Sequence, residues 1–128
     1  MDDAAAIQLV RDLSEACHRG EYDRFPEFLT DDAVFHMIPL PPVTGIAAIT
    51  AEWKKLAGMG TVEVEITRVA AKDDVVFTER VDSLQRGDER GDLPVVAVFE
   101  LRDGKVAAWR DYFDLQQSLD AFGIDEVI

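Results

Sequence analysis

Residues 75–86 read Val-Val-Phe-Thr-Glu-Arg-Val-Asp-Ser-Leu-Gln-Arg, and this run predicts a long β-strand. Side chains alternate across a strand, so Arg80 and Asp82 lie on the same face as Val76 and Leu84. Charged residues between aliphatic neighbours are informative, because a charge that faces a core needs a partner. The strand therefore predicts a sheet with a charged site on its inner face.

Three similar runs accompany this strand. They cover residues 61–71, 93–102 and 105–115, and turn residues at Asp73-Asp74 and Asp103-Gly104 separate neighbouring runs. Short turns of this kind join antiparallel strands. The second half of the chain is therefore predicted to be a meander of four strands.

The first half has helical spacing of its apolar residues. Helices are predicted at Asp3–Arg19, Glu21–Leu29, Gly45–Gly58 and Leu115–Phe122, and a short strand at Ala33–Ile38. The prolines of residues 39–42 must end that strand, since proline cannot donate to a ladder. Helices followed by a meander predict one α+β domain, residues 1–128, in which a bent sheet leaves a ligand cavity.

Composition excludes several classes of function. A formal net charge of -13 disfavours nucleic acid and anionic membranes as partners, and no apolar run approaches the length of a membrane span. Cys17 is the only cysteine and the N-terminus lacks a signal-peptide pattern, so we expect a cytoplasmic protein. His18 and His36 lack metal-ligand spacing, so we expect no cofactor; a magnesium site built from carboxylates alone stays open.

The last strand carries one charge on an otherwise apolar face. Trp109, Asp111 and Phe113 share that face, and a carboxylate between two aromatic residues is costly to bury alone. Arg80 is the candidate partner, because its planar fork can hold Asp82 and Asp111 together. Two carboxylates in one site separate into an acid and a base. The alternative is an ion pair that serves only the fold.

Three segments together resemble a known family. Ile38–Pro42, Phe77–Asp82 and Trp109–Asp114 are similar to motifs of the limonene-1,2-epoxide hydrolase family, within the SnoaL-like and nuclear-transport-factor-2-like folds. The resemblance extends from about Asp31 to Phe122. It implies a curved mixed sheet that forms a cone-shaped half-barrel, N-terminal helices that close a deep pocket, and a homodimer formed through the sheet.

The resemblance also implies a reaction and roles for the charged residues. Asp82 would protonate the oxygen of a small apolar epoxide, Asp111 would deprotonate the attacking water, and Arg80 would hold both carboxylates. The product would be a vicinal diol, formed in one step without a cofactor. The residues expected to line the pocket are Phe35, Met37, Leu84, Phe99, Trp109 and Phe113.

One departure from the family pattern concerns the water. The family has a tyrosine and an asparagine that help to hold it, and the matching positions here are Phe35 and Met37, which offer no strong hydrogen bond. Thr78 or Tyr22 are candidate substitutes. Two other functions therefore stay open: a SnoaL-like cyclase or isomerase that uses the same acid–base pair without water, and a non-catalytic binder of small apolar ligands.

Overall fold

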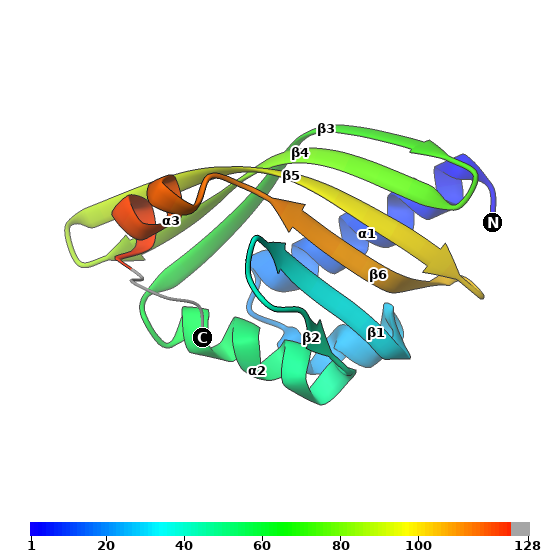
Figure 1. Ribbon diagram of the computed structural model, residues 1–128, viewed down its shortest axis with the longest axis horizontal. Helices are drawn as coiled ribbons and strands as arrows, with labels where there is room; N and C mark the ends of the chain where they lie inside the picture. Colours follow the sequence, from blue (N-terminus) through cyan, green and yellow to red (C-terminus); the bar gives the residue numbers. More distant parts are fainter. Residues whose placement is uncertain (124–128) are drawn as a thin grey trace.

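The computed structural model describes residues 1–123, and the last five residues of the predicted domain, 124–128, lie outside the described residues. The described chain has an α+β fold in which three α-helices and a short 3₁₀ helix accompany a six-stranded sheet (Figure 1). The elements in chain order are α1 (Asp3–His18), η1 (Tyr22–Glu27), β1 (Leu29–Ile38), β2 (Val43–Thr44), α2 (Ile46–Ala57), β3 (Thr61–Lys72), β4 (Val75–Arg86), β5 (Glu89–Arg102), β6 (Lys105–Tyr112) and α3 (Leu115–Phe122).

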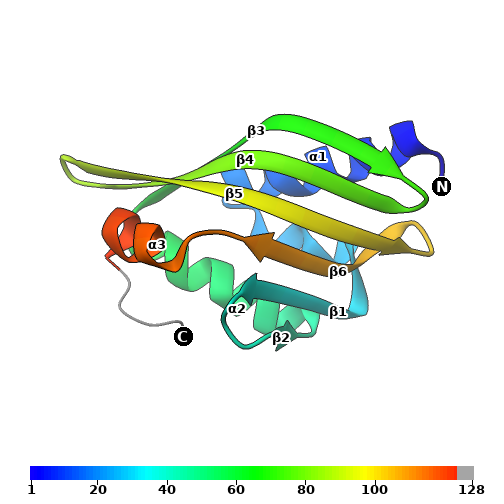
Figure 2. The same cartoon turned by 45° about the horizontal axis from the view of Figure 1, so that its top comes forward.

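The sheet is curved, mixed and unclosed, as the resemblance implied. Its strand order is β2-β1-β6-β5-β4-β3, and every neighbouring pair is antiparallel except β1 and β6, which are parallel. Figure 2 shows the long strands β3, β4 and β5 arching over α1. The four strands of the second half form the predicted antiparallel meander, so that prediction is confirmed.

The helices close the concave side of the sheet. α1 begins at the predicted position, where the carboxylate of Asp2 accepts from the N–H of Ala5 at 2.7 Å, and the chain turns after it at Gly20, with φ +70°. α2 lies beneath β1 and β2, and α3 lies at the end of the sheet near the β4–β5 turn (Figure 1). No helix among residues 1–123 is long and apolar enough to cross a bilayer.

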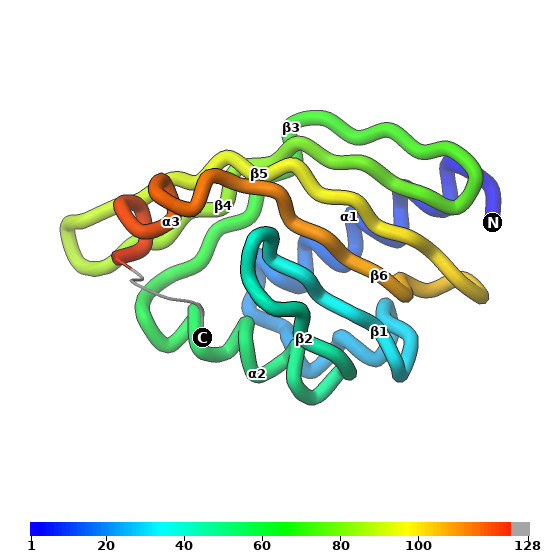
Figure 3. Tube along the Cα trace, in the orientation of Figure 1, coloured from blue at the N-terminus to red at the C-terminus, as the bar shows by residue number. Residues whose placement is uncertain are grey.

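Several element boundaries differ from the predictions. The predicted helix at 21–29 is the shorter η1, because Pro26 lies inside it and removes a backbone donor. β1 begins at Leu29 rather than at Ala33, and β5 begins at Glu89, so both strands are longer than expected. The two-residue strand β2 was not predicted; Figure 3 shows the chain doubling back from β1 into it.

Candidate active site

The sheet register brings together three charged residues from two strands. Arg80 and Asp82 lie on β4 and Asp111 lies on β6, with β5 between them. Val95 of β5 is opposite Arg80, and Ala97 of β5 is opposite Asp111. The small side chain of Ala97 leaves room on the inner face, so the long arginine side chain can cross β5 and reach Asp111.

Arg80 holds both carboxylates through its guanidinium group. Its Nε donates to Asp82 Oδ1 at 2.7 Å, and its Nη2 donates to Asp82 Oδ2 at 3.0 Å. Nη1 donates to Asp111 Oδ1 at 3.0 Å, and Nη2 also donates to Asp111 Oδ2 at 2.5 Å. Trp109 Nε1 adds a fifth contact, to Asp111 Oδ1 at 2.9 Å. We refer to Arg80, Asp82 and Asp111 as the charged trio.

Burial governs the electrostatics of the charged trio. The side chain of Arg80 is 2% exposed, so its charge depends on its two partners. Burial opposes that charge, but Asp111 and Asp82 outweigh it and hold the pKa of Arg80 well above its usual range. Burial also raises the pKa of Asp111, while Arg80 and Trp109 act against that rise. Two carboxylates around one arginine favour a state in which the site carries an additional proton.

Counting lone pairs indicates where such a proton or a ligand can go. Asp111 Oδ1 accepts from Arg80 and from Trp109, whereas Asp111 Oδ2 accepts from Arg80 alone. Each carboxylate oxygen has two lone pairs, so among these contacts Asp111 Oδ2 keeps one acceptor position. Both oxygens of Asp82 also keep one. The site can therefore present one carboxyl proton and one free carboxylate position at the same time.

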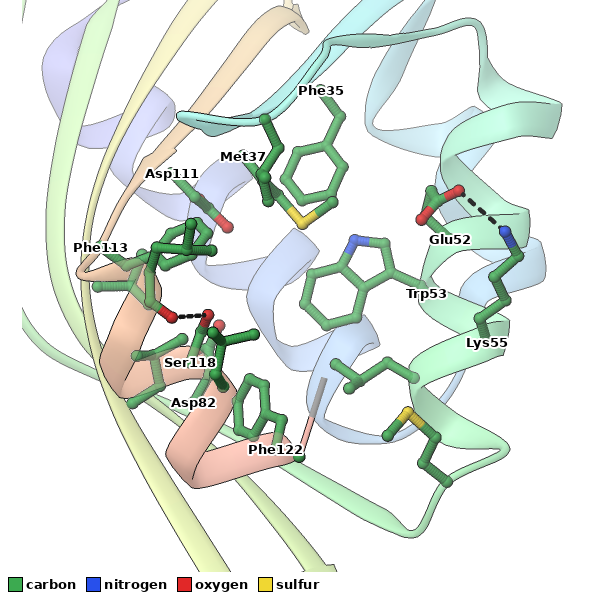
Figure 4. Close-up of a pocket in the computed structure, with 18 residues that line it drawn as sticks. Phe35, Met37, Glu52, Trp53, Lys55, Asp82, Asp111, Phe113, Ser118 and Phe122 are labelled. Carbon is green, nitrogen blue, oxygen red and sulfur yellow. Dashed lines mark hydrogen bonds and ion pairs between the residues drawn. The ribbon is translucent and has the colours of Figure 1, made fainter. Parts of the chain in front are cut away.

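The two carboxylates border a pocket of about 360 Å³, whereas Arg80 lies behind them and is absent from its wall. Figure 4 shows Asp82 and Asp111 on the sheet side of this pocket, with Glu52, Trp53 and Lys55 of α2 on the other side. Apart from these groups the wall is mainly apolar, and its volume suits a small organic ligand.

Half of the predicted apolar lining lies in the pocket wall. Phe35, Met37 and Phe113 do border the pocket. The prediction needs correcting for the other three, Leu84, Phe99 and Trp109, which belong to the buried core and are absent from the pocket wall. Trp109 shows the reason. Its indole is enclosed by the rings of Phe25, Phe35, Trp53 and Phe99, with centroids 4.4–6.4 Å away.

Sequence reasoning missed the pocket residues that the helices contribute. α2 and the residues after it supply Glu52, Trp53, Lys55, Leu56 and Met59, and α3 supplies Leu115, Ser118, Leu119 and Phe122. Trp53 and Leu56 follow the apolar spacing of a helix, but that spacing indicates burial without distinguishing a core from a pocket. Leu93 and Val95 of β5 were missed because alternation along a strand likewise does not distinguish a core from a pocket, and Leu40 lies in the proline-rich turn after β1, outside any periodic pattern.

The residues at the expected water-holding positions lie on β1, the strand that pairs with the Asp111 strand β6. β1 runs parallel to β6, and the register pairs Met37 with Asp111 and Phe35 with Trp109. Met37 and Asp111 are therefore neighbours across the β1–β6 pair, and both border the pocket. The candidate substitutes Thr78 and Tyr22 are both buried, and neither borders the pocket.

Cys17 and the acidic side chains supply no metal site. Among residues 1–123, no three or more His, Cys, Asp or Glu side chains are grouped so that they could hold a metal ion. Cys17 lies buried on α1, and burial raises the pKa of its thiol well above the usual value. It therefore packs as a neutral side chain on the helix that covers the site.

Comparison with known proteins gives the family. A family model for the limonene-1,2-epoxide hydrolase catalytic domain matches residues 4–123. The chain is 33% identical over 100 residues to the epoxide hydrolase EphG of Mycobacterium tuberculosis. The aligned residues cover 78% of this chain and 67% of EphG. Among solved structures, an epoxide hydrolase of Mycobacterium tuberculosis that resembles limonene-1,2-epoxide hydrolase superposes with a TM-score of 0.82 and 30% identity, over 94% of this chain and 90% of that one. A proposed polyketide cyclase from Xanthomonas campestris has the same TM-score, 0.82, at 25% identity, over 93% of this chain and 97% of that one. The chain thus belongs to the limonene-1,2-epoxide hydrolase family.

Proposed function

We propose that this protein hydrolyses a small apolar epoxide to a vicinal diol in one step. The observation that carries the proposal is the guanidinium of Arg80, which holds two buried carboxylates at the edge of an apolar pocket. Family membership and the relative EphG support the same reaction class. In this reaction Asp82 is the general acid and Asp111 is the general base.

The proton count follows from the charged trio. Asp82 transfers its proton to the epoxide oxygen as the carbon–oxygen bond breaks, and water forms the new carbon–oxygen bond while its proton moves to Asp111. The free position on Asp111 Oδ2 is the acceptor, since Oδ1 already accepts two hydrogen bonds. The trio ends with the same number of protons. The proton on Asp111 returns to Asp82 through the emptied pocket before the next turnover.

General acid and general base contributions of this kind are each worth about 10²–10⁴-fold in rate. Burial raises the pKa of Asp111, and this makes its carboxylate a stronger base in the state in which it carries no proton. Trp109 keeps the carboxylate oriented through its hydrogen bond to Oδ1. Phe35 and Met37 contribute apolar contacts with the substrate, as does Phe113.

The test uses a panel of small epoxides in water labelled with oxygen-18. We expect a diol that carries one solvent oxygen, and a loss of turnover of at least about 10²-fold in both Asp82→Asn and Asp111→Asn. Asp88→Asn is the matched control, because it removes an exposed turn carboxylate that is absent from the pocket wall. Turnover that survives either active-site change contradicts the assigned roles.

A second reaction is favoured by one observation, the apolar Met37 beside Asp111. With no strong anchor for water at that position, a nucleophile within the substrate could open the epoxide with the same acid and base. The oxygen label separates the two reactions. A ring-opened product without solvent oxygen supports internal attack, and tight binding without any turnover supports the non-catalytic binder.

We also propose a homodimer formed through the outer face of the sheet. Phe77, Val96 and Tyr112 are 46%, 47% and 42% exposed, and the register pairs Val96 with Tyr112. Exposed apolar side chains on the outer face of the sheet, repeated on two copies, suit a two-fold interface. Sedimentation should give a dimer for the wild type and a monomer for Val96→Lys. A monomeric wild type would exclude this interface.

For the compartment we propose the cytoplasm. The chain has one cysteine, so it needs no oxidising environment for an internal disulfide. Microscopy or fractionation of cells that carry the tagged protein tests this, and recovery in a secreted fraction would contradict it.

A further inference from the structure

The α2 side of the pocket carries two polar atoms that have no hydrogen-bond partner among the described residues. They are Trp53 Nε1 and Glu52 Oε2, and both are shielded from solvent. The other carboxylate oxygen of Glu52 is accounted for, since Lys55 Nζ lies 3.4 Å from Oε1. Buried polar atoms nearly always have a hydrogen-bond partner, so two buried polar atoms without one on the same wall call for a physical explanation.

The two atoms are chemically complementary. An indole N–H only donates and a carboxylate oxygen only accepts. The residues are consecutive on α2, and both border the pocket. Figure 4 shows the indole nitrogen on the side of the ring that faces Glu52, across the pocket from Asp82 and Asp111. The α2 wall therefore contains one donor and one acceptor, both covered by neighbouring atoms, at the end of the cavity remote from the charged trio.

Packing fixes the orientation of the donor. Trp53 is 5% exposed, and its ring lies against Tyr22, Phe35 and Trp109 with centroids 5.7–6.2 Å away. An indole held on several sides cannot rotate freely to find a partner elsewhere. A ligand oxygen that displaces the atoms now covering Nε1 therefore meets a donor whose orientation is already fixed.

We propose that Trp53 and Glu52 form a subsite for a hydroxyl group of the ligand. Trp53 Nε1 donates to the hydroxyl oxygen, and the hydroxyl hydrogen is donated to Glu52 Oε2. An alcohol satisfies both atoms through a single oxygen. A ketone satisfies Trp53 and leaves Glu52 unpaired, and a carboxylate is repelled by Glu52. If the proposed hydrolysis is correct, on which this step rests, the substrate class is an apolar epoxide with a remote hydroxyl group.

The binding test does not depend on turnover. Calorimetry compares cyclooctanol, cyclooctanone and cyclooctane, which share one carbon skeleton. We expect the wild type to bind the alcohol at least about tenfold more tightly than either analogue, because a site built for a hydroxyl leaves its polar atoms unpaired around the others. Trp53→Phe keeps an aromatic side chain but removes the N–H together with part of the indole, and Glu52→Gln keeps the shape of the side chain and removes its charge. Each should lower the ratio of cyclooctanol affinity to cyclooctane affinity measured within the same variant, so that a change of pocket volume, which affects both ligands, cancels.

Two results would overturn the subsite. The first is an alcohol preference that persists in both variants, which would make the pair a structural contact or a water site. The second is a preference lost only in Asp82→Asn, which would put the hydroxyl group at the charged trio instead. Thermal melting of each variant checks that it is folded. If Trp53→Phe fails to fold, Glu52→Gln still tests the subsite. A protein that shows the preference but hydrolyses no epoxide retains the subsite and loses only the proposed reaction.

Discussion

Replacing Arg80 with methionine tests the electrostatic argument most directly. The Arg80→Met change keeps a long flexible side chain and removes the positive charge together with four hydrogen bonds to Asp82 and Asp111. Removing one partner of a buried ion pair costs about 3–5 kcal/mol, because the remaining charge stays buried without compensation. Two carboxylates are left here, so we expect the upper part of that range at pH 7. The whole free energy of unfolding of a domain of this size is about 5–15 kcal/mol, so the expected loss is a large part of it.

The pH dependence of that loss has a definite sign. Burial raises the pKa of Asp111, and Arg80 now opposes that rise, so removing Arg80 raises it further. A carboxyl whose pKa is higher in the folded state contributes fully below its unfolded value, about 3.9, and loses stability as the pH rises through the folded value. The variant should therefore be closest to the wild type near pH 4 and furthest from it near pH 7.

Urea denaturation of both proteins at pH 4.5 and at pH 7 measures the difference, with the slope on denaturant checked for two-state behaviour. Arg68→Met is the matched control. Arg68 also pairs with a carboxylate, that of Glu79, but its side chain is 80% exposed, so little stability should change. A loss below about 1 kcal/mol at pH 7, or a loss that does not shrink at pH 4.5, refutes the claim that Arg80 compensates two buried charges.

Three further predictions concern turnover and the shape of the pocket. kcat/KM should fall as the pH is lowered and Asp111 becomes protonated, and the midpoint of this fall should lie above the ordinary aspartate pKa of about 3.9. A pH–rate profile whose midpoint lies at or below that value would count against Asp111 as the base. Phe35→Tyr combined with Met37→Asn should raise the rate of hydrolysis at least about fivefold if one hydrogen bond of about 1–3 kcal/mol to the water is restored. Unchanged steady-state kinetics would mean that another group already holds the water. Gly91→Ala should lower the free energy of unfolding by about 1–3 kcal/mol and weaken ligand binding, because its Cβ would lie 1.7 Å from the backbone oxygen of Ala121 on α3. A melting curve identical to that of the wild type would show that α3 can shift with no loss of stability.

The alternation within single strands was sufficient to predict much of the sheet. It placed Arg80 and Asp82 on one face and Asp111 on the inner face of another strand, and all three are buried there. Alternation could not show that Arg80 reaches Asp111, because that depends on the register across β5 and on the small size of Ala97. Pairing between strands is a non-local property, and the contact was predicted from charge balance instead.

The pocket wall was harder to predict than the charged site. Apolar residues on an inner face can serve a core or a cavity, and periodicity is identical in the two cases. Leu84 and Phe99 were therefore assigned to the pocket although they belong to the core, and the lining residues of α2 and α3 were not named. Glu52 carried a signal that could have been used, since it is a charged residue next to the apolar stripe of a helix that faces the sheet.

The positions of the two polar walls bear on which nucleophile opens the ring. A substrate hydroxyl held by Trp53 and Glu52 lies across the pocket from Asp111, so the base cannot deprotonate it while it is bound there. Internal attack by that hydroxyl is then disfavoured, which favours the proposed attack by solvent water at the free acceptor position of Asp111. Loss of the hydroxyl subsite should consequently reduce the selectivity for solvent water as the nucleophile as well as the preference for a hydroxylated ligand. In Glu52→Gln, a hydroxylated epoxide should give a larger share of product without solvent oxygen than it gives with the wild type, and an unchanged share would mean that the subsite has no influence on the choice of nucleophile.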